Sequence, residues 1–405
     1  MPWVPRSAAL IAGRDGTIVG RIRWMFDRNL WRTGRGWLAT LVGVVALAGS
    51  AAASGAPMPV AARLAAATNA FAAAHSAYPG VALAVVSPQL RWTGSAGHPA
   101  FGSHAVLDPR AGFRIASVTK TFTAASVLRL VETGRLGLDD PIEAHLAPAT
   151  VALLRSGGYD PEAIHVRHLL MHTSGLYDYA SDPKFVEYAL THGRHHWTRA
   201  EQVRFAMTHG KPYAPPGQEF HYADTGYVLL GEIVERATGR PLASAFRRLL
   251  GFEKLGLTHT YLESLEPRPQ AARPRAHQYY QRIDATGFDP SFDLYGGGGL
   301  VSTVGDLARF YRVLLHGQVF EKRATLRTML GKPNSRRVAD LGMGIFSNRI
   351  GGRGGEDCWA HSGFWGTTVM HCPASDVTVA LTVDQADNFD MPSQRFLATI
   401  LRLVR

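Results

Sequence analysis

Apolar residues near the N-terminal end of the chain predict one helix and one β-hairpin. Residues 59–78 are rich in alanine and have the apolar spacing of a helix. An apolar run at 80–87 is typical of a buried strand, and the stretch at 90–97 follows it after a short polar turn. We therefore expect 80–87 and 90–97 to pair.

The middle of the chain has a different pattern. From about 117 to 255 the apolar positions recur with helical spacing, and Gly134 and Gly239 mark expected helix ends. Residues 256–295 contain several prolines and predict loops. This part of the chain is therefore expected to be mainly helical.

Strands return in the C-terminal quarter, after the sequence "GGGGLVST" and one further helix. We expect strands near 341–347, 357–363, 367–372 and 377–384, followed by a helix at about 393–405. Strands at both ends of the chain with helices between them predict one sheet assembled from both termini. The predicted domains are a sheet domain (58–110 and 296–405) and a mainly helical domain (111–295).

Composition excludes several classes of protein. The 405 residues are 46% hydrophobic and 19% charged, as in an ordinary globular protein. The net charge is +11, of which residues 1–53 supply +5 through seven arginines and two aspartates. No run of basic residues alternates with aromatic residues, so we expect no nucleic-acid partner.

The N-terminal segment has the features of a signal peptide. Three arginines precede an apolar run at 37–48, which is followed by the small residues "GSAAASGA". We predict that residues 1–56 are a signal peptide and that the mature protein is periplasmic or extracellular. Met25 would be a better start than Met1. An uncleaved membrane anchor is the alternative, although the apolar run is shorter than the ~20 residues of a span.

The chain has two cysteines, Cys358 and Cys372, which lie at equal distances in sequence from Trp365. A hairpin centred on Trp365 would place the two cysteines opposite each other, which permits a disulfide in an exported protein. Two buried free thiols are the alternative.

Position 120 is unusual because it is a lysine. Only six of the 43 basic residues are lysines, and Lys120 is the first of them. A buried lysine can lose its proton and act as a base, whereas arginine stays charged. Ser117 lies three residues earlier, so one helical turn would bring the serine hydroxyl within reach of the amine. The Ser-x-x-Lys spacing alone is a weak signal, because Ser117 could simply cap its helix.

Two further motifs follow in order. "EFHYADTGYVLLG" places Tyr222 ahead of an amphipathic helix with Asp224 two residues later, and "CWAHSGFWG" places His361 at the end of a strand. Each of these residues, taken singly, also fits an ordinary structural role. Together with "VRHLLMHTSGL" and "GGGGLVSTVGDLARF", the three motifs resemble the serine β-lactamase and penicillin-binding-protein superfamily over about 58–405. The resemblance is nearest to class C β-lactamases, D-alanyl-D-alanine carboxypeptidases and related esterases.

This resemblance implies an α/β fold, with an antiparallel sheet flanked by N- and C-terminal helices beside an all-helical domain. It also implies that Ser117 is acylated, that Lys120 and Tyr222 act as general base and general acid, and that no metal or other cofactor takes part. The backbone N–H groups of Ser117 and Phe364 would form the oxyanion hole. The implied substrate-binding residues are Asp224, His361, Ser362 and Gly363.

Asp224 departs from the pattern of the family, because most relatives with lactamase activity have asparagine there. A carboxylate cannot donate a hydrogen bond to a substrate carbonyl, and it would hold Lys120 in its charged form. A neutral His361 would also be a weaker anchor for a β-lactam carboxylate than a lysine. We therefore expect an exported serine hydrolase that resembles D-alanyl-D-alanine carboxypeptidases or esterases, with a class C β-lactamase as the alternative.

The sequence also allows other functions and other kinds of site. A non-catalytic envelope protein of the same fold is the main alternative of another class. His165, His168 and His172 could form a metal site if they shared a helix face. The glycines at 296–299 lack the Lys-Ser/Thr of a phosphate loop, so they predict a turn. The expected partner is a small molecule or a peptide, such as a peptidoglycan stem peptide, and the protein is expected to be a monomer.

Overall fold

The computed structural model describes residues 58–331, 341–351, 354–386 and 391–405. The predicted signal peptide at 1–56 lies outside these ranges. Within the described ranges, no helix has both the length and the apolar character that a bilayer span requires.

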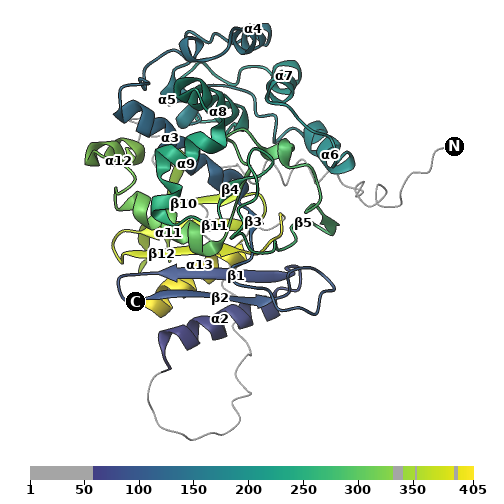
Figure 1. Ribbon diagram of the computed structural model, residues 1–405, viewed down its shortest axis with the longest axis vertical. Helices are drawn as coiled ribbons and strands as arrows, with labels where there is room; N and C mark the ends of the chain where they lie inside the picture. Colours follow the sequence, from purple (N-terminus) through teal and green to yellow (C-terminus); the bar gives the residue numbers. More distant parts are fainter. Residues whose placement is uncertain (1–57, 332–340, 352–353, 387–390) are drawn as a thin grey trace, which may run out of the picture.

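The central element is a seven-stranded antiparallel sheet built from both ends of the chain (Figure 1). Its strands run in the order β2-β1-β12-β11-β10-β9-β8, so the N-terminal hairpin lies beside the last strand, with Ala84 opposite Ala380. This confirms the predicted fold class. The strands are β1 (Gly80–Val86), β2 (Arg91–Gly97), β8 (Leu341–Gly342), β9 (Ile345–Ile350), β10 (Glu356–Gly363), β11 (Thr367–Cys372) and β12 (Val377–Thr382).

Both faces of the sheet are covered. Leu83 and its neighbours on one face pack in a core with α2 (Val60–Ala74) and α13 (Met391–Val404), the two terminal helices. Ala84 on the other face belongs to a second core that includes α11 (Val304–Leu315). Because alternate residues of a strand point to opposite faces, an apolar run such as "GVALAVV" suits a strand buried on both sides.

The helical part of the chain lies on the α11 side of the sheet, at the top of Figure 1. A small sheet joins the two ends of this helical part of the chain. Its strands are, in order, β3 (Phe113–Arg114), β7 (Leu300–Ser302) and β4 (Tyr261–Leu262). The pair β5 (Tyr279–Tyr280) and β6 (Ile283–Asp284) forms a separate hairpin. The remaining helices are α3 (Thr119–Glu132), α4 (Pro148–Ser156), α5 (Val166–Leu170), α6 (Pro183–Thr191), α7 (Arg199–His209), α8 (Asp224–Thr238), α9 (Leu242–Leu250), α10 (Phe252–Leu255) and α12 (Arg323–Leu330).

One strand prediction was wrong. The stretch at 341–347 forms no single strand, because the chain reverses at Gly344 and continues as β9. Gly344 has a φ of 69°, which favours glycine, and a Cβ there would lie 2.6 Å from the side chain of Ala124. The turn therefore needs both the backbone freedom and the small size of glycine, which an apolar pattern does not reveal.

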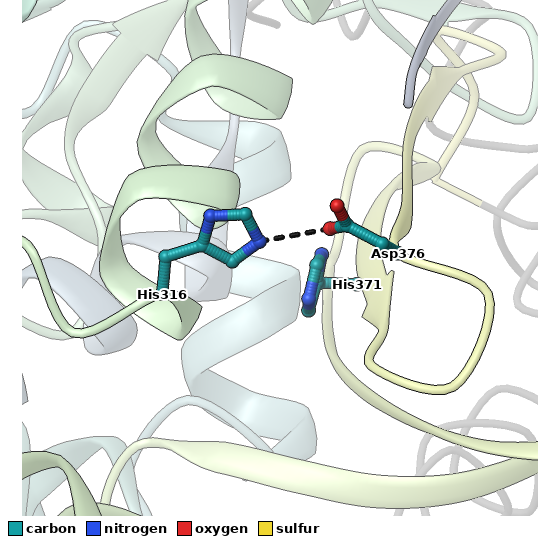
Figure 2. Close-up of side chains that lie close together, drawn as sticks. All are labelled: His316, His371 and Asp376. Atoms are coloured by element: carbon teal, nitrogen blue, oxygen red, sulfur yellow. Dashed lines mark hydrogen bonds and ion pairs between the residues drawn. The ribbon is translucent and has the colours of Figure 1, made fainter. Parts of the chain in front are cut away.

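The hairpin of β10 and β11 carries two features away from its turn. Cys358 and Cys372 form a disulfide between the strands. His371, the residue before Cys372, lies beside His316 and Asp376 (Figure 2).

Candidate active site

Ser117 lies in a tight turn at the start of α3. The 3₁₀ turn Ala116–Val118 leads directly into the helix, and Ala116 has a φ of 43°. This left-handed conformation costs a non-glycine residue about 1–2 kcal/mol, so packing around the turn must hold it. The ammonium of Lys120 donates a hydrogen bond of 2.9 Å to the Ser117 hydroxyl. The predicted one-turn spacing thus places the two groups in direct contact.

Lys120 is fully buried and its position is fixed by three acceptors. Besides Ser117 Oγ, its Nζ donates to Asp224 Oδ1 at 2.5 Å and to the backbone carbonyl of Gly297 at 2.8 Å. An ammonium has three N–H donors, so all of them are used. Gly297 belongs to the tetraglycine at 296–299, whose contact with Lys120 was not predicted.

Tyr222 lies in the loop before α8, as predicted, and its ring is 5.0 Å from Lys120 Nζ. Burial raises the pKa of Tyr222 well above its usual value and the charge of Asp224 raises it further, while a hydrogen bond with the Ser117 hydroxyl acts in the opposite direction. The resting side chain is a neutral phenol.

His172 positions this tyrosine. Its ring stacks on Tyr222 with centroids 4.2 Å apart, and its Nδ1 accepts a hydrogen bond from the backbone N–H of Ala223 at 3.1 Å. This role excludes the alternative of a metal site with His165 and His168. The helix α5 ends at Leu170, so His172 does not share a helix face with them.

Two carboxyl groups near Lys120, the buried Asp178 and the partly buried Asp293, were missed by the sequence analysis. Asp178 accepts a hydrogen bond of 2.9 Å from the backbone N–H of Asp224. Burial raises the pKa of Asp178 to about 7 and that of Asp293 to about 7, and in both the charge of Asp224 adds to the effect. Nothing in the sequence signals these residues, because they come from loops far apart in the chain.

The end of β10 packs closely against the turn that carries Ser117. A Cβ on Gly363 would lie 2.1 Å from the carbonyl oxygen of Ile115, so only glycine fits there. This contact brings the next residue, Phe364, close to the turn of Ser117, and the oxyanion hole of Ser117 and Phe364 stays a prediction. The hydroxyl of Ser362 is 3.0 Å from Thr368 on β11 and is held within the hairpin.

His361 is buried at the same end of β10 and its Nδ1 lies 2.8 Å from the carbonyl oxygen of Ser362. Burial, together with the positive charge of Lys120, lowers the pKa of His361 to about 3. His361 is therefore a neutral side chain at neutral pH.

This environment predicts a pH dependence of stability. The folded-state pKa of His361 lies below the unfolded value of 6.5, so its contribution is complete above pH 6.5 and is lost as the pH falls towards 3. Between pH 6.5 and 5 we expect a loss of about 2 kcal/mol from this group. Denaturant unfolding of the wild type and His361→Gln at pH 7 and pH 5 measures it. Equal pH dependence in both proteins would contradict the prediction.

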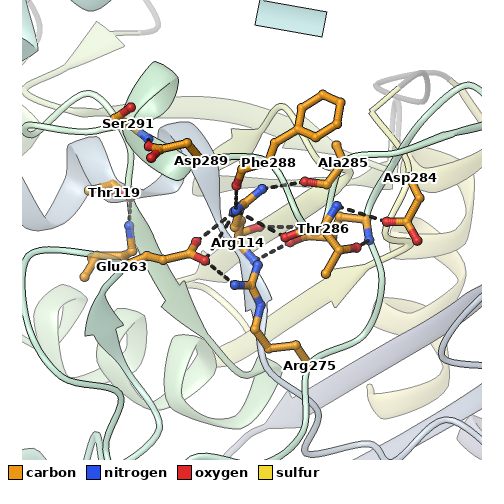
Figure 3. A network of polar contacts seen from close by, with 12 residues as sticks. Arg114, Thr119, Glu263, Arg275, Asp284, Ala285, Thr286, Phe288, Asp289 and Ser291 are labelled. Atoms are coloured by element: carbon orange, nitrogen blue, oxygen red, sulfur yellow. Dashed lines mark hydrogen bonds and ion pairs between the residues drawn. The ribbon is translucent and has the colours of Figure 1, made fainter. Parts of the chain in front are cut away.

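Arg114, three residues before Ser117, forms hydrogen bonds to the loop segment at 256–295 and holds it beside the site (Figure 3). Its side chain donates to Glu263 at 2.7 Å and to the carbonyl oxygens of Ala285 and Phe288 at 2.8 and 2.7 Å. Because Arg114 is buried, these bonds replace its hydration and fix the loop beside the turn of Ser117.

Comparisons with known proteins now identify the family. Residues 64–401 match the family model described as Beta-lactamase. The chain belongs to the beta-lactamase family. This confirms the predicted resemblance to serine β-lactamases and penicillin-binding proteins.

The curated relatives of this beta-lactamase-family chain have several activities in their names. Penicillin-binding protein 4* of Bacillus subtilis is 26% identical over 258 residues, which cover 60% of this chain and 53% of that protein. Esterase EstB of Burkholderia gladioli is 31% identical over 222 residues, which cover 49% and 55%. The chain thus spans about half the length of these curated relatives.

Solved structures cover more of the chain. A D-stereospecific amidohydrolase from Streptomyces sp. has a TM-score of 0.68 at 28% identity, and the match covers 82% of this chain and 97% of that one. A D-amino acid amidase from Ochrobactrum anthropi SV3, complexed with D-phenylalanine, has a TM-score of 0.69 at 26% identity, with 85% and 100% covered. The beta-lactamase-family chain therefore has relatives named as a penicillin-binding protein, an esterase and two hydrolases of amides in one superfamily of serine hydrolases.

Proposed function

We propose that this protein is a serine hydrolase that transfers the acyl group of an amide or ester to Ser117 and then to water. The observation that carries the proposal is the hydrogen bond of 2.9 Å between Ser117 Oγ and Lys120 Nζ. The Tyr222 phenol forms a hydrogen bond with the same serine hydroxyl. The names of the esterase and amidohydrolase relatives support the proposal.

The geometry suggests a route for the protons. Lys120 passes one proton to Asp224, and the neutral amine then accepts the Ser117 proton as Oγ attacks the carbonyl carbon. The neutral Tyr222 phenol protonates the leaving amine or alcohol, and the resulting phenolate later takes a proton from the deacylating water. Backbone N–H groups of Ser117 and Phe364 stabilise the oxyanion, each worth about 3 kcal/mol.

The charges of the site favour substrates without a carboxylate near the scissile bond. His361 is neutral, and Asp224 lies beside Lys120, while Asp178 and Asp293, with pKa values raised to about 7, each carry only part of a negative charge at neutral pH. This arrangement disfavours the carboxylate of a β-lactam, and to a lesser extent that of a D-alanyl-D-alanine peptide. We therefore place small esters and D-amino acid amides first.

A panel of four substrates tests this order. D-Phenylalanine amide, a short p-nitrophenyl ester, a D-alanyl-D-alanine peptide and a chromogenic cephalosporin are compared at one enzyme concentration. The highest kcat/KM is expected for the ester or the amide. Rapid cephalosporin hydrolysis without hydrolysis of the ester would favour the class C β-lactamase alternative.

The cellular location of the protein is also part of the proposal. We place the mature protein outside the cytoplasm, because residues 1–56 have the sequence features of a signal peptide. Cell fractionation with N-terminal sequencing of the mature protein tests this location. Recovery of the uncleaved chain in the cytoplasm would contradict it.

Replacing the carboxylate that departs from the family pattern should change specificity. In Asp224→Asn an amide that can donate to a substrate carbonyl replaces an acceptor, and a hydrogen bond of this kind is worth about 1.5 kcal/mol. We expect the ratio of cephalosporin to ester kcat/KM to rise by on the order of tenfold. An unchanged ratio would show that Asp224 does not set the preference.

A further inference from the structure

Three potential metal ligands, His316, His371 and Asp376, lie close together (Figure 2). His316 follows the last turn of α11, His371 lies near the end of β11, and Asp376 lies in the turn between β11 and β12. Each offers one ligand atom, and these three atoms all lie within 4.8 Å of one another.

The surroundings orient all three side chains. His316 Nε2 is 2.8 Å from Asp376 Oδ1, and His371 Nδ1 is 2.9 Å from the hydroxyl of Thr378, which leaves the Nε2 of His371 available. Arg312 donates to the other carboxylate oxygen of Asp376 at 2.6 Å and to its backbone carbonyl at 2.9 Å. Such outer contacts are the kind that fix ligand geometry around a metal.

We propose that His316, His371 and Asp376 form a binding site for Zn²⁺, with water as the fourth ligand. Two imidazoles and one carboxylate are a ligand set that zinc accepts in tetrahedral geometry. Bond lengths of 2.0–2.1 Å separate such ligand atoms by about 3.4 Å, so His316 and Asp376 must move slightly apart. His316 can do so because its side chain is 34% exposed.

The groups around this position act on a bound cation in opposite directions. The guanidinium of Arg312 opposes it, while the carboxylate of Asp376 and the C-terminal end of the α11 dipole favour it. We therefore expect weaker binding than at a site without the arginine.

The zinc would serve stability rather than catalysis. Thr367 is the first residue of β11, directly after the hairpin turn that joins β10 to β11 beside the candidate active site. His371 lies four residues further along the strand, which corresponds to about 13 Å. The metal would join the end of α11 to the turn between two central strands. This inference is independent of the proposed function.

Titration of zinc into the full chain, purified without a polyhistidine tag and freed of metal by chelation, tests the site. We expect one equivalent of ZnCl₂ to bind in calorimetry and the Tm to rise by on the order of 3 °C at saturation. His316→Ala and Asp376→Asn are expected to lose both effects, and because both positions are partly exposed, the variants should fold.

A matched control is His145→Ala. His145 Nε2 also contacts an aspartate, Asp140, at 2.8 Å, but among the residues that the structure describes no second histidine is grouped with this pair. This variant should keep the zinc response of the wild type. A wild type that neither binds zinc nor changes its Tm, or a response that persists in His316→Ala, would overturn the proposal.

Discussion

Lys120→Met is expected to lower kcat/KM by about 10²–10⁴, because it removes the group that accepts the Ser117 proton. The same change should lower the free energy of unfolding by about 3–5 kcal/mol, because Asp224 then remains buried without its partner. Its carboxylate lies 2.5 Å from the amine and only 8% of its side chain is exposed. Steady-state kinetics and denaturant unfolding measure the two effects.

A double variant separates catalysis from stability. In Lys120→Met with Asp224→Asn, no buried charge is left without a partner, so most of the lost stability should return. Activity should stay at the level of Lys120→Met, because no base is restored. If the double variant regained activity, Lys120 would act only by balancing the charge of Asp224.

Ser117→Ala is expected to abolish the acyl-enzyme. With no hydroxyl to form the covalent intermediate, kcat/KM should fall by at least about 10⁴. Stability should change by about 1 kcal/mol or less, because the hydroxyl contributes one hydrogen bond with Lys120 and one with Tyr222 at a partly exposed position. A fluorophosphonate probe, read by gel fluorescence and peptide mass spectrometry, reports the modified residue.

Ser156→Ala is the control for this experiment. Ser156 is the last residue of α4, and its hydroxyl donates to the backbone carbonyl of Leu153 and does not contact a base. The control should be labelled as strongly as the wild type. Labelling that persists in Ser117→Ala would identify another nucleophile, and a wild type that neither labels nor hydrolyses any substrate would favour the non-catalytic alternative.

Most of the fold could be predicted because each element carries its own signal. The run at 80–86 is apolar on both faces of its strand, and the helix that follows Ser117 has apolar positions at helical spacing up to Glu132. The wrong prediction of a single strand at 341–347 has a local cause. The reversal depends on Gly344, and a glycine inside an apolar stretch has the same appearance whether the chain turns or continues.

The candidate site was predictable only in part. Ser117 and Lys120 are neighbours on one turn, so their contact follows from local geometry. His172 and Asp178 could not be predicted, because their roles depend on a loop that folds back onto the start of α8. The contact of Gly297 with Lys120 joins residues 177 positions apart.

The sequence by itself determined the order of the elements, the family and the identity of the reactive groups, because these depend on residue types at short and regular spacings. Tertiary structure alone decided their chemical state. Burial keeps the phenol of Tyr222 and the imidazole of His361 neutral and sets two carboxyl groups to titrate near neutral pH. Desolvation and the distance between charges are properties of the packed molecule, and segments far apart in the chain create them together.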